Sequence, residues 1–325
     1  MKLAVFGAGQ IVADFLPHAG DVAGLELAAL CGRPQSRDKL EVLAAQFGIA
    51  RVHTDEAACL VDPGVDTVWI ALPNSLHYDA ARRALEAGKH VVCEKPFVLR
   101  AEELTELRAL AEERGLILVE AISTQYLGNV VWMRDNLSRL GDLRLVQCEF
   151  SQYSSRYDAF CAGEAPPAFD PAQGGGALRD LGIYTLHLVV GLLGRPDTVT
   201  ALAHVERGVD TSGVVTLGYP GMSAVCTFAK DSPGPSRTKI QGTRGVMIVD
   251  GPPNAVPAVR LEVRGDAPEV VERNAHEHRM VEEFRAFVAM VRDGDLAERD
   301  RRLDHSAAVL DTALAALSAT ELGER

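Results

Sequence analysis

The sequence predicts an α/β protein in which a doubly wound parallel sheet is followed by an α+β domain with a large, mostly antiparallel sheet. Over roughly the first 120 residues, short apolar runs alternate with longer stretches that repeat apolar residues at helical spacing. This alternation is typical of a doubly wound sheet. After about residue 122, strand-like segments follow one another and are separated by short turns rich in Gly, Pro and Asp, which indicates antiparallel pairing.

The predicted parallel strands are apolar on both faces, as expected for a sheet that helices cover on both sides. They lie in the segments KLAVFGAG, LELAALCG, TVWIALP, HVVCEKP and LILVEAIS. The helical patterns between them stop at Gly48, Gly88 and Gly115, and glycine just past the last turn is a common helix end. We therefore predict that residues 1–122 form the first domain and residues 123–325 the second.

The second domain is predicted to contain a run of strands interrupted by one long helix. The strand-like segments are LRLVQCEFSQYS, TVTALAHVE, SGVVTLGYP, MSAVCTFAK, RTKIQGTRGVMIVDG and AVRLEVRG. The helical patterns are GALRDLGIYTLHLVVGLLG inside this half, and HRMVEEFRAFVAMVRDG and DHSAAVLDTALAALSATE at its end. The pattern of the last helix is compatible with packing back onto the first domain.

The composition is that of a soluble globular protein, with 47% hydrophobic and 24% charged residues in a chain of 325. The formal net charge of −12 argues against a nucleic-acid partner, because phosphates would be repelled. No apolar run reaches the ~20 residues of a membrane helix, and MKLAVFGAGQ resembles a strand rather than a leader. The six cysteines form no CxxC pair, so we expect buried, reduced thiols and a cytoplasmic protein.

A glycine-rich turn follows the first predicted strand in FGAGQIVADF. Gly7 and Gly9 stand where a dinucleotide-binding fold needs a tight turn and a close approach to a pyrophosphate. Val12 replaces the third glycine of the usual pattern, and an ordinary strand-to-helix turn is the alternative. The surrounding βαβ order favours nucleotide binding.

The end of the second predicted strand distinguishes NADP from NAD. An acidic residue there would bind the ribose hydroxyl of NAD, but Gly32 and Arg33 occupy this place, and Arg37 and Lys39 follow. Basic side chains suit the 2′-phosphate of NADP because charge-assisted hydrogen bonds are strong. The sequence therefore favours NADP, although a solvated basic helix start would look the same.

Three further motifs lead to a family resemblance: Pro73, Asn74 and His77 in PNSLH, the EKP at 94–96, and GGGALRDLGIY at 174–184. Together with GAGQI they resemble the glucose-fructose oxidoreductase / inositol dehydrogenase / rhizopine catabolism (Gfo/Idh/MocA) family of nicotinamide-dependent oxidoreductases. The resemblance runs through nearly the whole chain. The glycine turn is unspecific, whereas the EKP motif combined with the later glycine block is highly specific.

The resemblance implies a Rossmann domain and a set of cofactor contacts. In the family, the EKP lysine projects beside the nicotinamide and the peptide before the proline is usually cis. These roles fall on Lys95 and Pro96, and Glu94 is placed near the cofactor. The expected cofactor-binding residues are Gly7, Gly9, Gln10, Ile11, Arg33, Arg37, Leu72, Pro73, Asn74, His77, Glu94 and Lys95.

The proposed acid/base group lies in the segment DLGIYTLH. Asp180, Tyr184 and His187 are four and then three residues apart, so one face of a helix can carry all three. Many relatives have a histidine at the Tyr184 position. A tyrosine there resembles the branch of the family that contains glucose-fructose oxidoreductase, dimeric dihydrodiol dehydrogenase and related sugar dehydrogenases. A nearby ammonium lowers the pKa of a tyrosine, and Lys95 is the candidate. By resemblance the catalytic residues are Lys95, Asp180 and Tyr184, whereas the role of His187 stays open.

A hydroxyl-rich segment, FSQYSSRYDAF, precedes the glycine block and suits a polyhydroxylated ligand. A polar surface loop is the alternative. The expected substrate-binding residues are Lys95, Tyr153, Arg156, Asp180, Tyr184 and His187. The pair His276 and His278 has no further ligands in a recognisable frame, so we predict no metal site.

The sequence thus predicts an NADP-dependent dehydrogenase or reductase for a hydroxyl or carbonyl group of a sugar, polyol or cyclic diol. A ketoreductase for a nucleotide-linked deoxysugar and a non-catalytic nucleotide sensor are the alternatives. Retention of Lys95, Asp180 and Tyr184 argues against the sensor. By resemblance, a homodimer or homotetramer is expected to form through the sheet of the second domain.

Overall fold

The computed structural model describes residues 1–324 and divides into two compact units. Unit 1 contains Met1–Ala121 and Met280–Asp304, and unit 2 contains Ile122–Arg279 and the chain from His305 onward. Two C-terminal helices therefore take part in unit 1: α9 (Arg279–Asp293) and the first part of α10 (Leu296–Ser318). This return of the chain is larger than the single last helix considered from the sequence.

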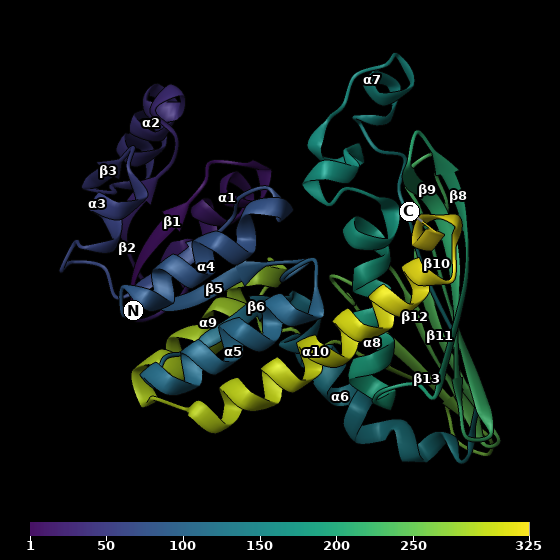
Figure 1. Cartoon of the computed structure of the whole chain (residues 1–325). Coiled ribbons are helices and arrows are strands. Elements are labelled where there is room, and N and C mark those ends of the chain that lie inside the picture. The colour runs from purple at the N-terminus through teal and green to yellow at the C-terminus, as the bar shows by residue number, and fades with distance from the viewer. Residues whose placement is uncertain (325) are drawn as a thin grey trace. The chain divides into compact units, whose positions relative to one another are not determined.

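Unit 1 is built on a parallel six-stranded sheet in the order β3-β2-β1-β4-β5-β6 (Figure 1). The strand β1 pairs with both β2 and β4, so the strand order reverses beside it. Ligands of such sheets bind at the carboxyl ends of the strands at this reversal. The strands are Lys2–Phe6 (β1), Glu26–Cys31 (β2), Arg51–His53 (β3), Thr67–Ile70 (β4), His90–Glu94 (β5) and Leu118–Ala121 (β6).

The helices of unit 1 end where the sequence predicted. Gly48 and Gly115 are left-handed C-caps, with φ of 67° and 64°, and Gly88 adopts φ of 76° two residues after its helix. Glycine takes this conformation without the steric cost of a side chain. The helices are Gln10–Phe15 (α1), Arg37–Phe47 (α2), Glu56–Leu60 (α3), His77–Glu86 (α4) and Ala101–Arg114 (α5).

Helix α9 completes the core of unit 1. The ring of Phe284 stacks on Phe15 with 4.0 Å between ring centroids, and it contacts Trp69 edge-on at 5.1 Å. All three side chains have no exposed surface. Burial of large aromatic rings is among the strongest apolar contributions to stability, so α9 is an integral part of this unit.

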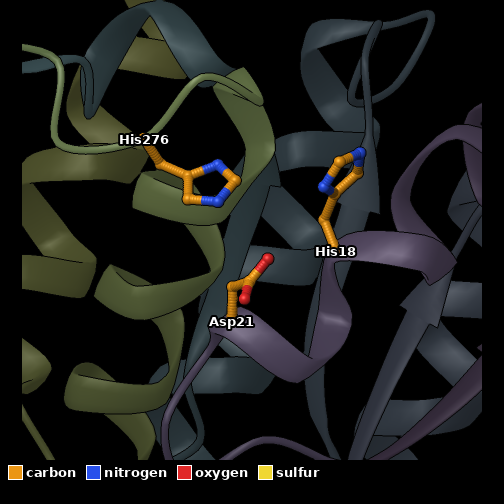
Figure 2. Close-up of side chains that lie close together, drawn as sticks. All are labelled: His18, Asp21 and His276. Carbon is orange, nitrogen blue, oxygen red and sulfur yellow. The ribbon is translucent and has the colours of Figure 1, made fainter.

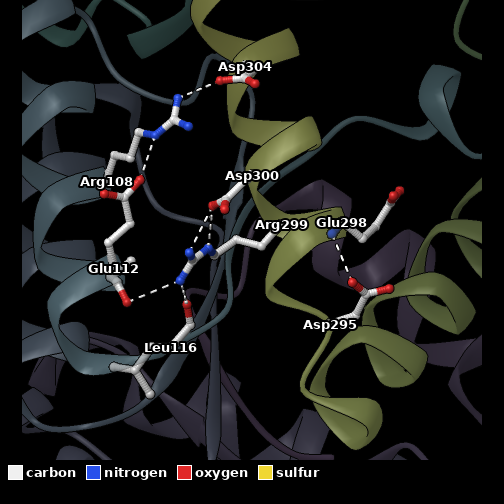
Figure 3. Close-up of polar contacts among 9 residues, drawn as sticks. Arg108, Glu112, Leu116, Asp295, Glu298, Arg299, Asp300 and Asp304 are labelled. Carbon is white, nitrogen blue, oxygen red and sulfur yellow. Dashed lines mark hydrogen bonds and ion pairs between the residues drawn. The ribbon is translucent and has the colours of Figure 1, made fainter.

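Hydrogen bonds and ion pairs of arginine side chains join the start of α10 to α5, as Figure 3 shows. The Arg299 side chain is 4% exposed and donates to the carbonyls of Ala111 (3.3 Å) and Leu116 (3.0 Å), while it pairs with Asp300. On the surface, Arg108 bridges Glu112 and Asp304. Because Arg299 satisfies carbonyls at the end of α5, its burial is compensated by hydrogen bonds.

Unit 2 contains an eight-stranded sheet in the order β14-β13-β12-β11-β7-β10-β9-β8, antiparallel except between β7 and β10. The strands are Leu143–Ser151 (β7), Thr198–Glu206 (β8), Val209–Tyr219 (β9), Met222–Ala229 (β10), Arg237–Gly242 (β11), Gly245–Asp250 (β12), Val259–Val263 (β13) and Glu269–Val271 (β14). The predicted α+β architecture is confirmed.

Helices of unit 2 lie on one face of this sheet, which Figure 1 shows nearly edge-on. They are Gly128–Asn136 (α6), Ile183–Leu193 (α8) and the part of α10 from His305 onward, while the short α7 (Tyr157–Cys161) lies outside this layer. Side chains such as Val146, Leu186 and Leu217 form the core between the layers. Leu202 of β8 is 80% exposed.

One helical stretch, Pro171–Leu193, is long and apolar enough to cross a membrane by length and composition. Two thirds of its apolar window, 67%, is buried inside the protein. A buried core helix of a soluble protein has the same properties, so the stretch is weak support for a membrane span.

Candidate active site

The glycine turn after β1 is shaped by close backbone contacts. Gly7 adopts φ of 117°, and a Cβ atom there would lie 2.3 Å from the carbonyl oxygen of Ala71. A Cβ atom on Gly9 would have no neighbour within 4 Å. Gly7 is therefore required by the fold, whereas Gly9 leaves open space at the start of α1. Such space allows a dinucleotide to approach the backbone closely, so the turn fits the predicted cofactor. Gln10 and Ile11 begin α1 directly after it.

The basic side chains after β2 differ in the hydrogen bonds and ion pairs that they make within the protein. Arg33 is exposed, and among residues 1–324 its guanidinium has no hydrogen bond or ion pair. Arg37 is held by Glu41 at 3.1 Å and by Thr54 at 3.4 Å. Lys39, which was left out of the expected contacts, donates to the carbonyl of Ala8 in the glycine turn. Lys39 thus lies against the glycine turn, and Arg33 is exposed just after β2.

The turn that carries Lys95 is fixed by buried polar groups. Glu94 is 8% exposed and accepts a hydrogen bond from the Trp69 indole at 3.1 Å. The backbone N–H of Phe97 donates to buried Glu120 at 3.0 Å. The Lys95–Pro96 peptide is cis, as the resemblance predicted. Lys95 is partly exposed, unlike its buried neighbours on both sides, so the turn presents the lysine outward.

His77 supports this turn from within unit 1. Its side chain has no exposed surface, and its ring nitrogens lie 2.9 Å from the carbonyl oxygens of Pro96 and Leu72. Burial lowers the pKa of His77, and a neutral ring can donate to one of these carbonyls at a time. The ring was expected to contact the cofactor. In this arrangement it contacts the backbone instead, and it ties the Lys95–Pro96 turn to the segment after β4.

The segment after β4 supplies the other expected cofactor contacts of this region. Leu72, Pro73 and Asn74 follow the strand at the carboxyl edge of the sheet, and Asn74 begins a short 3-10 turn, Asn74–Leu76. Leu72 and Asn74 are partly exposed, and Pro73 is exposed. These residues are therefore accessible beside the glycine turn, which Ala71 touches through its carbonyl.

In unit 2, Gly176 at the end of the glycine block 174–176 packs against a buried carboxylate. A Cβ atom on Gly176 would lie 2.1 Å from Asp210 Oδ1, and Gly176 adopts φ of 131°. Asp210 is 2% exposed and accepts a hydrogen bond from the backbone N–H of Leu178 at 2.6 Å. Burial raises the pKa of Asp210. Gly176 thus permits the chain to approach Asp210, and the helical turn begins there.

Asp180 does not lie on an ordinary α-helix. Residues Leu178–Gly182 form a π-helical turn, and α8 starts only at Ile183. The predicted α-helical spacing from Asp180 to Tyr184 is therefore interrupted. π-turns are rare and occur often at functional sites.

Asp180 is paired with a lysine that sequence reasoning missed. Asp180 Oδ2 lies 2.9 Å from the ammonium of Lys230, whose side chain is 2% exposed, whereas that of Asp180 is 40% exposed. Lys230 directly follows β10, in a strand end that carries no recognisable motif. The one sequence signal for it was that Lys230 directly follows the mostly apolar strand β10, which indicates that its charge could be buried.

Tyr184 and His187 lie on α8 with different environments. Tyr184 is 7% exposed, and its ring contacts Phe150 edge-on at 5.9 Å. His187 has no exposed surface, and its Nδ1 lies 2.9 Å from Nε2 of His305. His187 is therefore a core residue in this arrangement, and its predicted contact with substrate would require movement. The sequence offered no sign of the pairing with His305.

The hydroxyl-rich segment lies on the surface of unit 2. Tyr153 is 42% exposed and donates to Asp158 at 2.5 Å, and this hydrogen bond raises the pKa of the phenol. Arg156 is exposed at the start of α7. Arg207, at the β8–β9 turn, donates to the carbonyls of Phe160, Gly163 and Glu164 and so ties the end of this segment to the sheet. Tyr153 and Arg156 remain accessible.

Figure 2 draws three side chains with atoms that could bind a metal: His18 and Asp21 of unit 1 and His276 of unit 2. His18 and Asp21 lie on one 3-10 helix, Leu16–Asp21. In unit 2, His276 Nδ1 accepts a hydrogen bond from the His278 backbone at 2.9 Å. Among residues 1–324, neither unit by itself supplies the three or four ligands of a zinc site. Five of the six cysteines are buried as expected, whereas Cys161 is exposed, which corrects the expectation for that residue.

Two family descriptions match consecutive parts of the chain. The oxidoreductase family with an NAD-binding Rossmann fold (GFO_IDH_MocA) matches residues 1–121, and the GFO/IDH/MocA C-terminal domain matches residues 137–248. The NADP(+)-dependent scyllo-inositol 2-dehydrogenase IolU of Bacillus subtilis is 31% identical over 94% of this chain and 93% of its own length. The mouse trans-1,2-dihydrobenzene-1,2-diol dehydrogenase is 30% identical over 76% of this chain and 73% of its own length.

A solved structure with similar architecture is a 3-ketoreductase from Actinomadura kijaniata, in complex with NADP and TDP-benzene. It has a TM-score of 0.83 and 26% identity, and the match covers 98% of this chain and 97% of that one. Forms of this ketoreductase with one lysine or one tyrosine replaced also match. The predicted Rossmann fold and the predicted similarity to inositol and dihydrodiol dehydrogenases are confirmed.

Proposed function

The chain belongs to the Gfo/Idh/MocA family of NAD(P)-dependent oxidoreductases, and we propose that it transfers hydride between NADP and a hydroxyl or carbonyl carbon of a cyclic polyol, a sugar or a cyclic diol. The observation that carries this proposal is the turn after β5. There, Glu120 and His77 contact the backbone, Glu94 binds the Trp69 indole, and Lys95 is partly exposed between buried neighbours. A buried scaffold around a partly exposed lysine is suited to a fixed catalytic charge.

NADP is the proposed cofactor. The open space at Gly9 and the exposed Arg33 support it, since Gly32 and Arg33, and not a carboxylate, directly follow β2 where an unphosphorylated ribose would be bound. Arg33 and Lys39 are proposed to bind the 2′-phosphate. The NADP dependence of the inositol dehydrogenase relative points the same way.

The proposed chemistry divides among three side chains. When bound, the nicotinamide supplies the hydride acceptor or donor. As the alcohol is oxidised, the Tyr184 phenolate accepts the hydroxyl proton, and the Tyr184 phenol donates this proton back when a carbonyl is reduced. The Lys95 ammonium stabilises the negative charge that develops on the substrate oxygen. Asp180 accepts a hydrogen bond from a substrate hydroxyl and so orients the ring.

The substrate class is tested by steady-state assays that follow nicotinamide absorbance with purified protein. We expect oxidation of a cyclic polyol or trans-diol with NADP and slower reaction with NAD. The matched control is the Lys95→Met variant, which keeps the length of the side chain and removes its charge. Equal activity of this variant and the wild type would overturn the role of Lys95, and inactivity of the wild type with every cyclic polyol, sugar and diol would overturn the substrate class.

A nucleotide-linked keto-sugar is the second candidate substrate class. The high structural similarity to the NADP-bound 3-ketoreductase over 98% of the chain favours it. In this case NADPH oxidation by a TDP-linked keto-sugar would proceed with a KM far below that of the free keto-sugar. Equal KM values for the two would rule out recognition of the nucleotide.

A cytoplasmic location is part of the same proposal. All six cysteines are free thiols, which suits a reducing cytosol.

A homo-oligomer is also part of the proposal. The exposed apolar side chains of Leu202 and Val214, which are opposite one another in β8 and β9, suit contact with a second copy of the chain. Light scattering of the purified protein checks for a dimer or tetramer.

A further inference from the structure

Lys230 is a buried lysine whose ammonium contacts a carboxylate, a backbone carbonyl and an aromatic ring of unit 2. The ammonium lies 2.9 Å from Asp180 Oδ2 and donates to the carbonyl of Ala168 at 2.8 Å. It also lies 4.1 Å from the ring centroid of Phe169, above the face of the ring. The three contacts come from the π-turn and from the 3-10 turn Pro167–Phe169, while the lysine itself follows β10.

Burying an ammonium is costly unless geometry compensates for the lost hydration. The side chain of Lys230 is 2% exposed, yet its partner Asp180 remains 40% exposed. The lysine therefore approaches the carboxylate from the protein interior and leaves part of the carboxylate accessible. A salt bridge that served stability alone would gain little from a partner left so open to solvent.

Two further charged groups lie around this pair. Asp210 binds the backbone N–H of Leu178 and so fixes the start of the π-turn. Arg179 is partly exposed in the same turn, and among residues 1–324 it forms no ion pair. Asp210 thus holds the backbone, whereas Lys230 holds the Asp180 side chain. The two carboxylates have separate tasks.

We propose that Lys230 is a positioning residue, which acts through Asp180 by holding its carboxylate in the orientation that receives a substrate hydroxyl. This inference rests on the proposed function and adds a residue to it. Without Lys230, Asp180 would lose the ion pair that approaches its carboxylate from the protein interior, and the carboxylate would bind substrate in productive and unproductive orientations. A misplacement of ~1 Å costs on the order of 10²-fold in rate, so the effect on turnover is large.

The test is a double-mutant cycle of Lys230→Met and Asp180→Asn, measured on the substrate that the wild type turns over. We expect Lys230→Met alone to lower kcat/KM about 10–100-fold. In the Asp180→Asn background, the same change should lower it less than about 2-fold, because the carboxylate that Lys230 acts through is already gone. A full loss in both backgrounds would overturn the proposal.

Controls separate positioning from folding. Lys239→Met, at a partly exposed lysine of β11 in the same sheet, should leave kcat/KM unchanged. Lys230→Arg, which keeps a cation, should restore part of the activity lost in Lys230→Met. If Lys230→Met does not fold, Lys230→Arg takes its place in the cycle. The wild type, Lys230→Arg, Asp180→Asn and the double variant are then compared, and Lys230→Arg should lower kcat/KM less in the Asp180→Asn background than alone.

Failure of this inference differs from failure of the proposed function. A wild type that is inactive on all substrate classes overturns the function and, with it, the role of Lys230. An active wild type with an equally active Lys230→Met overturns only the role of Lys230. NADPH affinity, measured by nicotinamide fluorescence, should be the same in every variant of unit 2.

Discussion

The Lys95–Pro96 turn of unit 1 and the Tyr153–Arg156 segment of unit 2 are both assigned to the proposed site, but they are built in opposite ways. Around Lys95, the buried groups Glu94, Glu120 and His77 contact the backbone or the core. Tyr153 and Arg156 are exposed, and Tyr153 contacts Asp158 and Tyr157, which are near neighbours in the sequence. The difference suggests that one region fixes reacting groups and the other adapts to the shape of the substrate.

The largest expected effect concerns a reacting group. Tyr184→Phe should lower kcat about 10²–10⁴-fold, because positioned proton transfer contributes a factor of this size. The phenyl ring can keep the edge-on contact with Phe150, so the thermal unfolding midpoint and the NADPH affinity should stay unchanged. Turnover within a few-fold of wild type would mean that another group transfers the proton.

The second largest effect is expected on the choice between NADPH and NADH, which we assign to the exposed Arg33. Arg33→Ala should raise the KM for NADPH about 10-fold or more and leave that for NADH unchanged, since a charge-assisted hydrogen bond is lost. Arg37→Ala is the matched control and should change KM less, because Glu41 and Thr54 already bind its guanidinium. If the two variants behave alike, the distinction between a free and a paired arginine is unimportant here.

His77 tests whether the buried scaffold supports the Lys95 turn. His77→Phe removes the donor that faces the Pro96 and Leu72 carbonyls, and a buried carbonyl left unsatisfied costs about 1–3 kcal/mol. We expect a lower free energy of unfolding together with lower kcat. His77→Gln, which retains an N–H donor, should recover part of both. Loss of stability with unchanged kcat would show that the scaffold does not position Lys95.

The pH dependence of stability follows from the same residue. Burial lowers the pKa of His77 below its ordinary value, so the folded ring binds fewer protons than the unfolded chain. The stability that it contributes is therefore fully present above a pH of about 6.5 and declines as the pH falls toward the folded pKa. Urea unfolding at about pH 7.5 and about pH 5 should show a smaller difference in His77→Gln than in wild type.

The smallest effect is expected in the exposed segment. Tyr153→Phe removes the hydrogen bond to Asp158 and should alter the unfolding midpoint little and kcat less than about 3-fold, because surface substitutions are usually mild. The ratio of kcat/KM values for two related polyols should change more than either kcat. An unaltered ratio would indicate that Tyr153 takes no part in selecting the substrate.

Local patterns in the sequence predicted most of the fold. Apolar periodicity and glycine stops identified the five longer strands of unit 1 and the ends of its main helices, because these depend on neighbouring residues. The strands β3 and β14 have three residues each and were missed, since so short a segment has no measurable period. The π-turn at Leu178–Gly182 was also missed, because its residues fit an α-helical pattern equally well.

For the site, the sequence by itself determined the glycine turn, the position of Lys95 and the order of Asp180 and Tyr184, because each belongs to a short contiguous motif. Only the tertiary structure decided which polar groups meet: Lys230 with Asp180, His77 with two carbonyls, and His187 with His305. The physical reason is that burial removes water from a polar side chain, which must then find a partner from a distant segment of the chain. That choice depends on packing, and no local pattern encodes it.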